Sequence, residues 1–401
     1  MFLYNSMWAW NPSSSLPDGV ILHAAGCPLD RAEVRDLPNS RNDYTLFDPN
    51  SYLWELDEGD CGRAVECVTS YPWVPEEPLR TNVELMSDDQ VTATLRAVAE
   101  WQAMRGATRV ILPTPLIADP SGTIDDFLRW ADLAIKLSPE VDRPVLLAVG
   151  LSEVTVATHF GTVLDQLTAR PDTPGVYAFV ETSRSSGRLA VNQEVARALL
   201  MTSYFVGRRL GKEVVINFAD TFGLACLAVG ASAFATGYER KGRSLDFEHF
   251  EERNGGGAFP KFFSLATSAN YRPERDMERI RNERLLRLLT SDRTASSASL
   301  FLALEEGRSA SEVPDWRESR SNVAAARAHL IERLCSAVDE LSAIPNSRDK
   351  VFWALNWLQD AERNVGYLNS RFEHAPLDDD GRHVGAWRAA FETFVEEFGL
   401  A

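Results

Sequence analysis

Three polar residues stand at the ends of apolar segments, where they could carry out acid–base chemistry. Glu181 directly follows the apolar run 176–180, and Asn217 and Asp220 follow the β-branched run 214–216. A carboxylate held at the edge of an apolar core is suited to act as a general acid or base. We therefore interpret Glu181, Asp220 and Asn217 as the candidate catalytic residues, with Glu181 transferring protons and the other two orienting a substrate.

A basic cluster follows the next apolar run, residues 231–235. Arginine offers a forked pair of donors and lysine a compact charge, and both suit an anion such as phosphate. Such a cluster is locally unusual in a chain whose net charge is −17. The predicted substrate-binding or anion-binding residues are Arg240, Lys241, Arg243, Lys261 and Thr236.

Each of these assignments has a structural alternative. Glu181 could form a salt bridge with Arg184 or Arg188, and Asp220 could be a helix N-cap. The basic cluster could be an ordinary solvated turn. The catalytic interpretation is preferred because Glu181, Asn217 and Asp220 follow apolar segments of the kind that form buried strands, while the basic cluster follows the seventh strand and Lys261 lies near the eighth.

Other polar residues end apolar segments or begin the segments after them, and they extend the list of candidates. They are His23, Asp48, Thr114, Asp119, Thr236 and Glu239, with Ser152 and Glu153 as further members. We assign no metal ligands. As an alternative, His23, Asp48, Glu181, Asn217 and Asp220 could meet and bind a divalent cation through oxygen. No glycine fingerprint of a nucleotide site follows the first strand, so the cofactor is left unknown.

The elements that position these residues follow a strand–helix rhythm. Residues 213–239 read as strand, turn, short helix and strand, with Gly230 ending the helix. Strands are also predicted at 19–25, 44–47, 109–112, 145–149 and 176–180, and helices at 88–106, 123–137, 152–169 and 192–210. Strand spacings of about 30 to 40 residues are typical of βα units. This pattern predicts a (β/α)8 barrel, whose active site lies at the C-terminal ends of the strands.

The two ends of the chain are harder to assign. Residues 1–18 read as an irregular leader, residues 51–82 as a long excursion near the barrel mouth, and 259–263 as the eighth strand. The predicted domains are a barrel over residues 1–290 and a helical extension over 291–401.

Three amphipathic helices are predicted in the extension, at 319–342, 349–369 and 384–398. Their apolar faces would pack within the appendage, or residues 319–398 would bind a partner protein or a second copy of the chain. The preferred function is an enzyme acting on a small anionic substrate, phosphorylated or nucleotide-derived. The alternative is a non-catalytic barrel subunit that docks through these helices.

The overall composition narrows the possible partners. The 401 residues include 41 basic and 58 acidic side chains, which disfavours non-specific binding to nucleic acid or anionic membranes. No apolar run approaches the roughly 20 residues of a membrane helix, and the five scattered cysteines read as reduced thiols. We therefore expect a cytoplasmic protein that does not bind a membrane.

Two segments resemble known barrel proteins. The sequence VVINFADTFGLACLAVGASAFATG, residues 214–237, is similar to the last βαβ turn of phosphate-binding barrels. The sequence GVYAFVETSRSSGR, residues 175–188, resembles the strand of tRNA-guanine transglycosylases that ends in their catalytic aspartate, where this chain has Glu181. The clustered Cys/His zinc site of those enzymes has no counterpart here. The second resemblance implies base exchange on nucleic acid, which we keep as a further alternative.

Overall fold

The protein consists of two compact units, seen in a computed structural model. The first unit comprises Met1–Asn11 and Asp18–Arg253, and the second comprises Pro12–Pro17 and Asn254–Ala401. The residues that the structure describes are 1–7, 15–54, 56, 58–76, 82–118, 123–182, 192–250 and 258–400.

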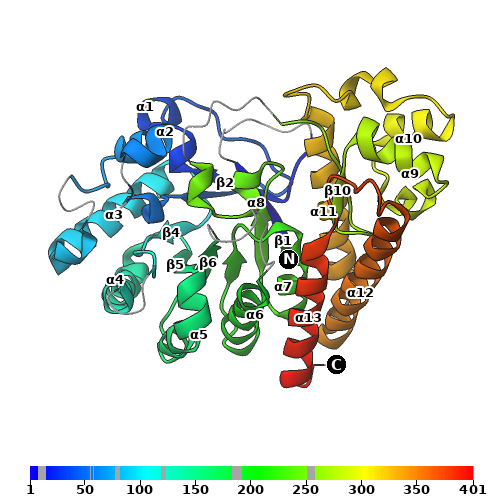
Figure 1. Ribbon diagram of the computed structural model, residues 1–401. Helices are drawn as coiled ribbons and strands as arrows, with labels where there is room; N and C mark the ends of the chain where they lie inside the picture. The colour runs from blue at the N-terminus through cyan, green and yellow to red at the C-terminus, as the bar shows by residue number, and fades with distance from the viewer. Residues whose placement is uncertain are drawn as a thin grey trace. The chain divides into compact units, whose positions relative to one another are not determined.

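The first unit is built on one eight-stranded parallel sheet (Figure 1). Its strands are β1 (Phe2–Met7), β2 (Gly19–His23), β3 (Tyr44–Asp48), β4 (Val110–Leu112), β5 (Val145–Ser152), β6 (Gly175–Glu181), β7 (Val214–Ile216) and β8 (Ala233–Thr236). Their order in the sheet is β3-β2-β1-β8-β7-β6-β5-β4. The two outer strands approach each other, because the Thr108 amide beside β4 donates to the Thr45 carbonyl of β3 at 2.8 Å. The sheet is therefore a nearly closed barrel, as the sequence predicted.

The predicted leader contains the first barrel strand, so that prediction was wrong. β1 pairs in parallel with β2, Tyr4 opposite Gly19, and with β8, Phe2 opposite Ala233. Its sequence, FLYNSM, has polar residues in the middle and no clean alternation. A strand that is stabilised mainly by pairing with its two neighbours need not show a strand pattern in its own sequence.

The eighth strand was also misplaced. Residues 262–264 form β9 (Phe262–Ser264), which pairs antiparallel with β10 (Ala269–Tyr271) in a separate two-stranded sheet of the second unit. Consecutive phenylalanines suit any buried strand, so composition does not distinguish a hairpin from a barrel strand. The predicted last barrel helix, 275–289, likewise lies in the second unit, as does the predicted boundary at residue 290.

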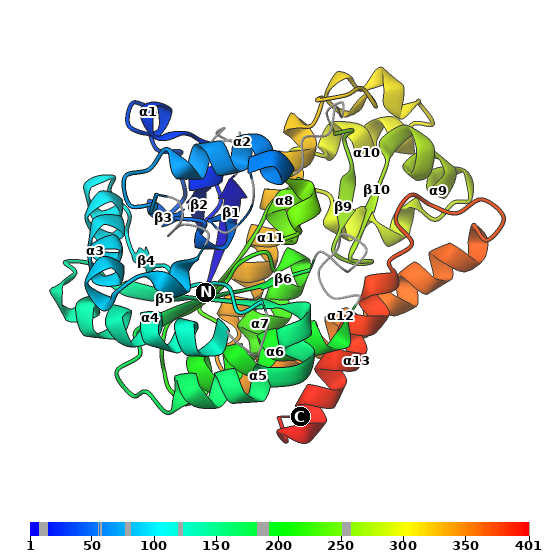
Figure 2. The ribbon, with the colours of Figure 1, turned by 60° about the vertical axis from the view of Figure 1, so that its left-hand side comes forward.

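Helices follow most of the strands in the first unit, as Figures 1 and 2 show. They are α1 (Leu29–Ala32), α2 (Glu58–Thr69), α3 (Asp88–Met104), α4 (Thr123–Leu137), α5 (Glu153–Thr168), α6 (Gln193–Thr202), α7 (Gly223–Val229) and α8 (Arg240–Arg243). The predicted capping box before α3 is confirmed. The Gln90 amide donates to Ser87 Oγ, and the Ser87 amide donates to Gln90 Oε1.

The segment 213–239 has the predicted order of strand, short helix and strand. Gly230 ends α7 with φ = +143°, a conformation that residues with a side chain rarely adopt. A Cβ there would lie 2.7 Å from the Ser203 carbonyl oxygen. Glycine at this position therefore lets the end of α7 pack closely against the segment Ser203–Arg209, which precedes β7.

The second unit contains the β9–β10 hairpin and mostly helices. Its helices are α9 (Glu278–Asn282), α10 (Ala298–Glu305), α11 (Ala324–Ala343), α12 (Ser347–Arg371) and α13 (Arg382–Glu397). The last three confirm the predicted amphipathic helices, and α12 and α13 pack against each other (Figure 2). Fully buried Trp387 and Val351 contribute to the core of this unit.

Candidate functional site

Polar side chains from β2, β3, β6 and the loop after β7 meet inside the C-terminal end of the barrel. Tyr177 Oη donates to Asp48 Oδ2 at 2.8 Å, and Tyr52 Oη donates to the same oxygen at 3.2 Å. Asn217 Nδ2 donates in turn to Tyr177 Oη, and Asn50 Nδ2 donates to Tyr52 Oη at 2.7 Å. We call these five residues the Asp48 network.

The Asp48 network is buried throughout. Asp48 is 2% exposed, Asn217 is 1% exposed, and Tyr177 is fully buried. Burial, together with the adjacent Asp48 carboxylate, raises the pKa of both phenols, Tyr52 and Tyr177, well above the usual value. Both phenols therefore stay protonated and act as donors, which makes the network a fixed scaffold for the carboxylate.

His23 joins the network from the end of β2 and also faces Ser6 of β1. Asn50 Oδ1 accepts from the Ala25 amide at 2.8 Å, which leaves Asn50 Nδ2 to donate to His23 Nδ1 at 3.0 Å. His23 Nε2 lies 2.8 Å from Ser6 Oγ, and His23 Nδ1 also lies 3.4 Å from Asp48 Oδ2. Ser6, His23 and Asp48 are thus adjacent in the barrel interior, and all three side chains are buried.

Aromatic rings pack beside this polar layer in the barrel interior. Phe218 stacks on His23 at 5.7 Å between ring centroids and meets Phe179 edge-on at 6.2 Å. Tyr52 lies 4.8 Å from Phe179. All of these rings are at most 4% exposed. The described part of the barrel interior is therefore filled by side chains, as cores of this fold are.

Replacing Tyr177 by Phe should lower the free energy of unfolding by about 1–3 kcal/mol. The change removes one donor to Asp48 and the acceptor of Asn217, leaving buried polar groups unpaired. Urea unfolding measures the loss, and Tyr44→Phe is the control because Tyr44 is half-buried and makes ring contacts. Equal losses in the two variants would contradict the structural importance of the Asp48 network.

Two of the predicted site residues form a pair: Asp220 lies in the loop after β7, and Arg243 lies on α8. Asp220 has φ = +44° and Phe218 has φ = +55°, an uncommon conformation for residues with side chains. Asp220 Oδ1 lies 3.8 Å from Arg243 Nη1, with both side chains buried. Arg243 Nε also donates to the Gly237 carbonyl at 3.1 Å. Arg243 is thus paired with Asp220 within the fold.

The remaining predicted residues are dispersed. Thr236 ends β8 and is buried, and its hydroxyl has no hydrogen-bond partner among the described residues. Glu181 is half-buried at the end of β6, opposite Ser152 of β5. Arg240 is exposed on α8. Lys261 belongs to the second unit, where its Nζ lies 2.7 Å from Asp378 Oδ2. Asp119, Arg184 and Arg188 lie outside the described residues.

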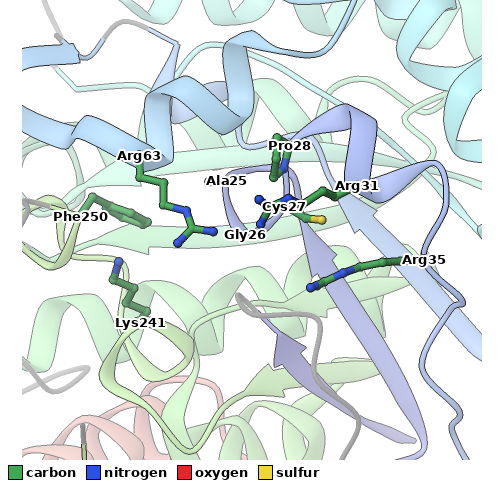
Figure 3. Close-up of a pocket in the computed structure, with 9 residues that line it drawn as sticks. All are labelled: Ala25, Gly26, Cys27, Pro28, Arg31, Arg35, Arg63, Lys241 and Phe250. Atoms are coloured by element: carbon green, nitrogen blue, oxygen red, sulfur yellow. The ribbon is translucent and has the colours of Figure 1, made fainter. Parts of the chain in front are cut away.

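A cationic pocket opens at the same end of the barrel (Figure 3). Its volume is about 240 Å³. The residues that line it are Ala25, Gly26, Cys27, Pro28, Arg31, Arg35, Arg63, Lys241 and Phe250. They come from segments that follow β2, β3 and β8, which places the pocket where the loops of this fold bind ligands. Four of these described lining residues are cationic and none is acidic.

Sequence reasoning found Lys241 but missed the three arginines. Arg31 and Arg35 lie in a stretch that resembles an ordinary polar loop, and Arg63 lies in the excursion 51–82. The only available signal was the spacing of Arg31 and Arg35, four residues apart. The Arg35 amide donates to the Arg31 carbonyl at 3.1 Å, so the two residues are one helical turn apart.

Cys27 is the described lining residue with a thiol side chain. It is 2% exposed. Burial raises the pKa of its thiol, and the guanidinium groups of Arg35, Arg31 and Arg63 oppose that effect in this order. The thiolate is the reactive form of cysteine, so this pocket does not present Cys27 as an activated nucleophile.

Comparisons with known proteins add no identification. The chain matches no model of a protein family, and no curated protein or solved structure matches it. Within the described ranges, no group of three or more His, Cys, Asp or Glu side chains could hold a metal ion. Across the same part of the chain, none of the helices combines the length and apolar character needed to cross a membrane.

Proposed function

We propose that this protein is an enzyme that binds a small anionic substrate, such as a phosphate ester, in the cationic pocket at the mouth of its barrel. The observation that carries the proposal is the charge of the pocket. Arg31, Arg35, Arg63 and Lys241 line it together, in a chain whose net charge is −17. One guanidinium group can donate two parallel hydrogen bonds to two oxygens of a phosphate or carboxylate, and lysine adds a compact positive charge.

The size of the pocket supports a small ligand. A volume of about 240 Å³ is below the roughly 300–1,000 Å³ of pockets that take drug-sized molecules. The Gly26 backbone and the Phe250 ring complete the lining. A compact phosphorylated metabolite fits this combination of volume and charge better than a nucleic acid or a large cofactor does.

The binding test compares anions at equal ionic strength. Phosphate is expected to raise the melting temperature more than chloride does. At a phosphate concentration a hundredfold above its Kd, the expected gain in the free energy of unfolding is roughly 2.7 kcal/mol. The double variant Arg63→Ala/Lys241→Ala should lose this increment. Arg240→Ala is the matched control, since Arg240 is exposed on the same short helix as Lys241 but does not line the pocket. An equal phosphate response in all three proteins would overturn the proposal.

Glu181 remains the candidate general acid or base. It is half-buried at the end of β6, whereas Asp220 is fully buried against Arg243 and Asn217 is part of the Asp48 network. A general acid or base must be reached by the substrate, and partial exposure leaves the Glu181 side chain open to such contact. Among the three predicted catalytic residues, Glu181 alone has that access in the described residues.

Substitution of Glu181 by Gln is expected to lower turnover by about a hundredfold, the usual scale for losing a positioned acid or base. The assay incubates the protein with a panel of phosphate esters and follows their consumption by mass spectrometry. Glu239→Gln, an exposed carboxylate beside α8, is the control and should retain activity. Full activity in Glu181→Gln would make Glu181 a structural carboxylate.

A non-catalytic barrel that docks to another protein is the second candidate. It is favoured by the filled barrel interior and by the half-buried Phe352 and Trp353 on α12. This alternative predicts that the protein converts none of the phosphate esters in the panel, whether or not it binds them. Base exchange on nucleic acid has no observation in its favour among the described residues.

A further inference from the structure

We propose that the ligand of the cationic pocket carries two separate anionic groups, as a bisphosphate or a phosphorylated carboxylate does. This inference rests on the proposed function and names the substrate class of the same site. The four cations form two pairs, Arg31 with Arg35 and Arg63 with Lys241. Each pair would bind one anionic group, and the body of the ligand would cross the pocket between them.

The first pair belongs to one segment after β2. Arg31 and Arg35 are one helical turn apart, so their side chains leave the same face. The carbonyls of Glu33 and Arg35 accept from Arg105 at 3.2 and 2.8 Å, which anchors this segment to α3. The two guanidinium groups are therefore presented from a supported stretch of backbone.

The second pair comes from α2 and α8. The Arg63 guanidinium interacts with the Cys67 thiol, four residues further along α2: burial raises the pKa of this thiol, and Arg63 opposes that effect. The Lys241 ammonium lies 4.9 Å from the centre of the buried Phe250 ring. Each side chain is thus held by a neighbour of its own, and both face the pocket.

Gly26 lies between the two pairs, and the Cys27 sulfur lies on the side of Arg31 and Arg35. Figure 3 shows Arg63, Lys241 and Phe250 toward one side of the pocket and Arg31 and Arg35 toward the other.

The number of charges also favours two anionic groups. A phosphate monoester carries about −1.5 to −2 at pH 7, which matches one pair of cations. A second phosphate or carboxylate matches the other pair. Joining both groups in one molecule makes the second contact intramolecular and raises affinity by roughly 10²–10⁴ without further contacts.

Calorimetric titration with two simple probes tests the inference. Propane-1,3-diol bisphosphate is expected to bind the wild-type protein about a hundredfold more tightly than propyl phosphate. Arg31→Ala/Arg35→Ala and Arg63→Ala/Lys241→Ala should each bring the bisphosphate close to the affinity of propyl phosphate. Arg240→Ala should leave both affinities unchanged.

The failures of the two proposals are distinguishable. If the bisphosphate binds no more tightly than propyl phosphate, or if only one of the double variants weakens its binding, the two-anion inference is wrong and the proposed anion binding in the cationic pocket stands. If neither probe binds the wild-type protein, the proposed function itself is wrong and the two-anion inference falls with it.

Discussion

Replacing Arg243 by Met is expected to lower the free energy of unfolding of the barrel by about 3–5 kcal/mol. The Arg243 and Asp220 side chains are 9% and 0% exposed, and their charged atoms are 3.8 Å apart. Methionine preserves much of the volume but leaves the Asp220 carboxylate buried without that opposite charge. A buried charge that loses its partner costs far more than an exposed pair contributes.

Urea unfolding of three variants isolates this pair. Arg243→Met should be much less stable than Arg240→Met, because Arg240 is exposed. The double variant Arg243→Met/Asp220→Asn should regain a large part of the loss, since asparagine carries no charge. Arg243→Met should also keep the stabilisation by phosphate, because Arg243 is not among the pocket residues. A loss below about 1 kcal/mol, the scale of an exposed ion pair, would contradict the buried pair.

Acidification from pH 7 to pH 4 is expected to remove about 3 kcal/mol of stability from the second unit through His329 alone. Burial lowers the pKa of His329 to about 4, while Asp292 and Glu332 act in the opposite direction. His329 Nε2 donates to the Phe263 carbonyl of β9 at 2.7 Å, and Nδ1 faces Thr294 Oγ1 at 2.9 Å. Its ring also stacks on Phe262 at 4.3 Å.

The sign of the effect follows from which state binds the proton. Between the usual histidine pKa of about 6.5 and the folded value of about 4, the unfolded chain is protonated and the folded chain is not. Stability is therefore fully present above pH 6.5 and is lost as the pH falls toward 4. Carboxylates titrate in the same interval, so a variant comparison is needed.

The measurement is hydrogen-exchange protection of residues 262–271, corrected for the pH dependence of intrinsic exchange. His329→Gln removes the titrating group and keeps an N–H donor. Its stability relative to the wild type should improve steadily as the pH falls. Parallel pH profiles for the two proteins would mean that His329 does not titrate in this interval.

The helices were predictable because their signals are local. The capping box of Ser87 and Gln90 and the apolar spacing behind it lie within one stretch of sequence, and α3 begins where they predict. The strands β5, β6 and β7 were recognised from β-branched and apolar runs in the same way. Glu181 and Asn217 at their ends followed directly, since residues after parallel strands share one edge of the sheet.

The composition of the site was not predictable to the same extent. The pocket combines Arg31, Arg35 and Arg63 with Lys241, which is 178 or more residues further along the chain. Nothing in the sequence around any one of these residues distinguishes it from a solvated surface cation. Arg243 lies two residues from Lys241 and pairs with Asp220 instead.

The sequence by itself therefore determined the class of fold, the helices and the end of the barrel where ligands are expected, because these depend on short-range periodicity and capping. The tertiary structure decided which strand pairs with β8, because its partner β1 is more than 200 residues away in the chain. It also decided which cationic side chains line the same pocket and which form buried ion pairs. Those outcomes depend on distances between residues far apart in the chain, which only the folded arrangement of the strands determines.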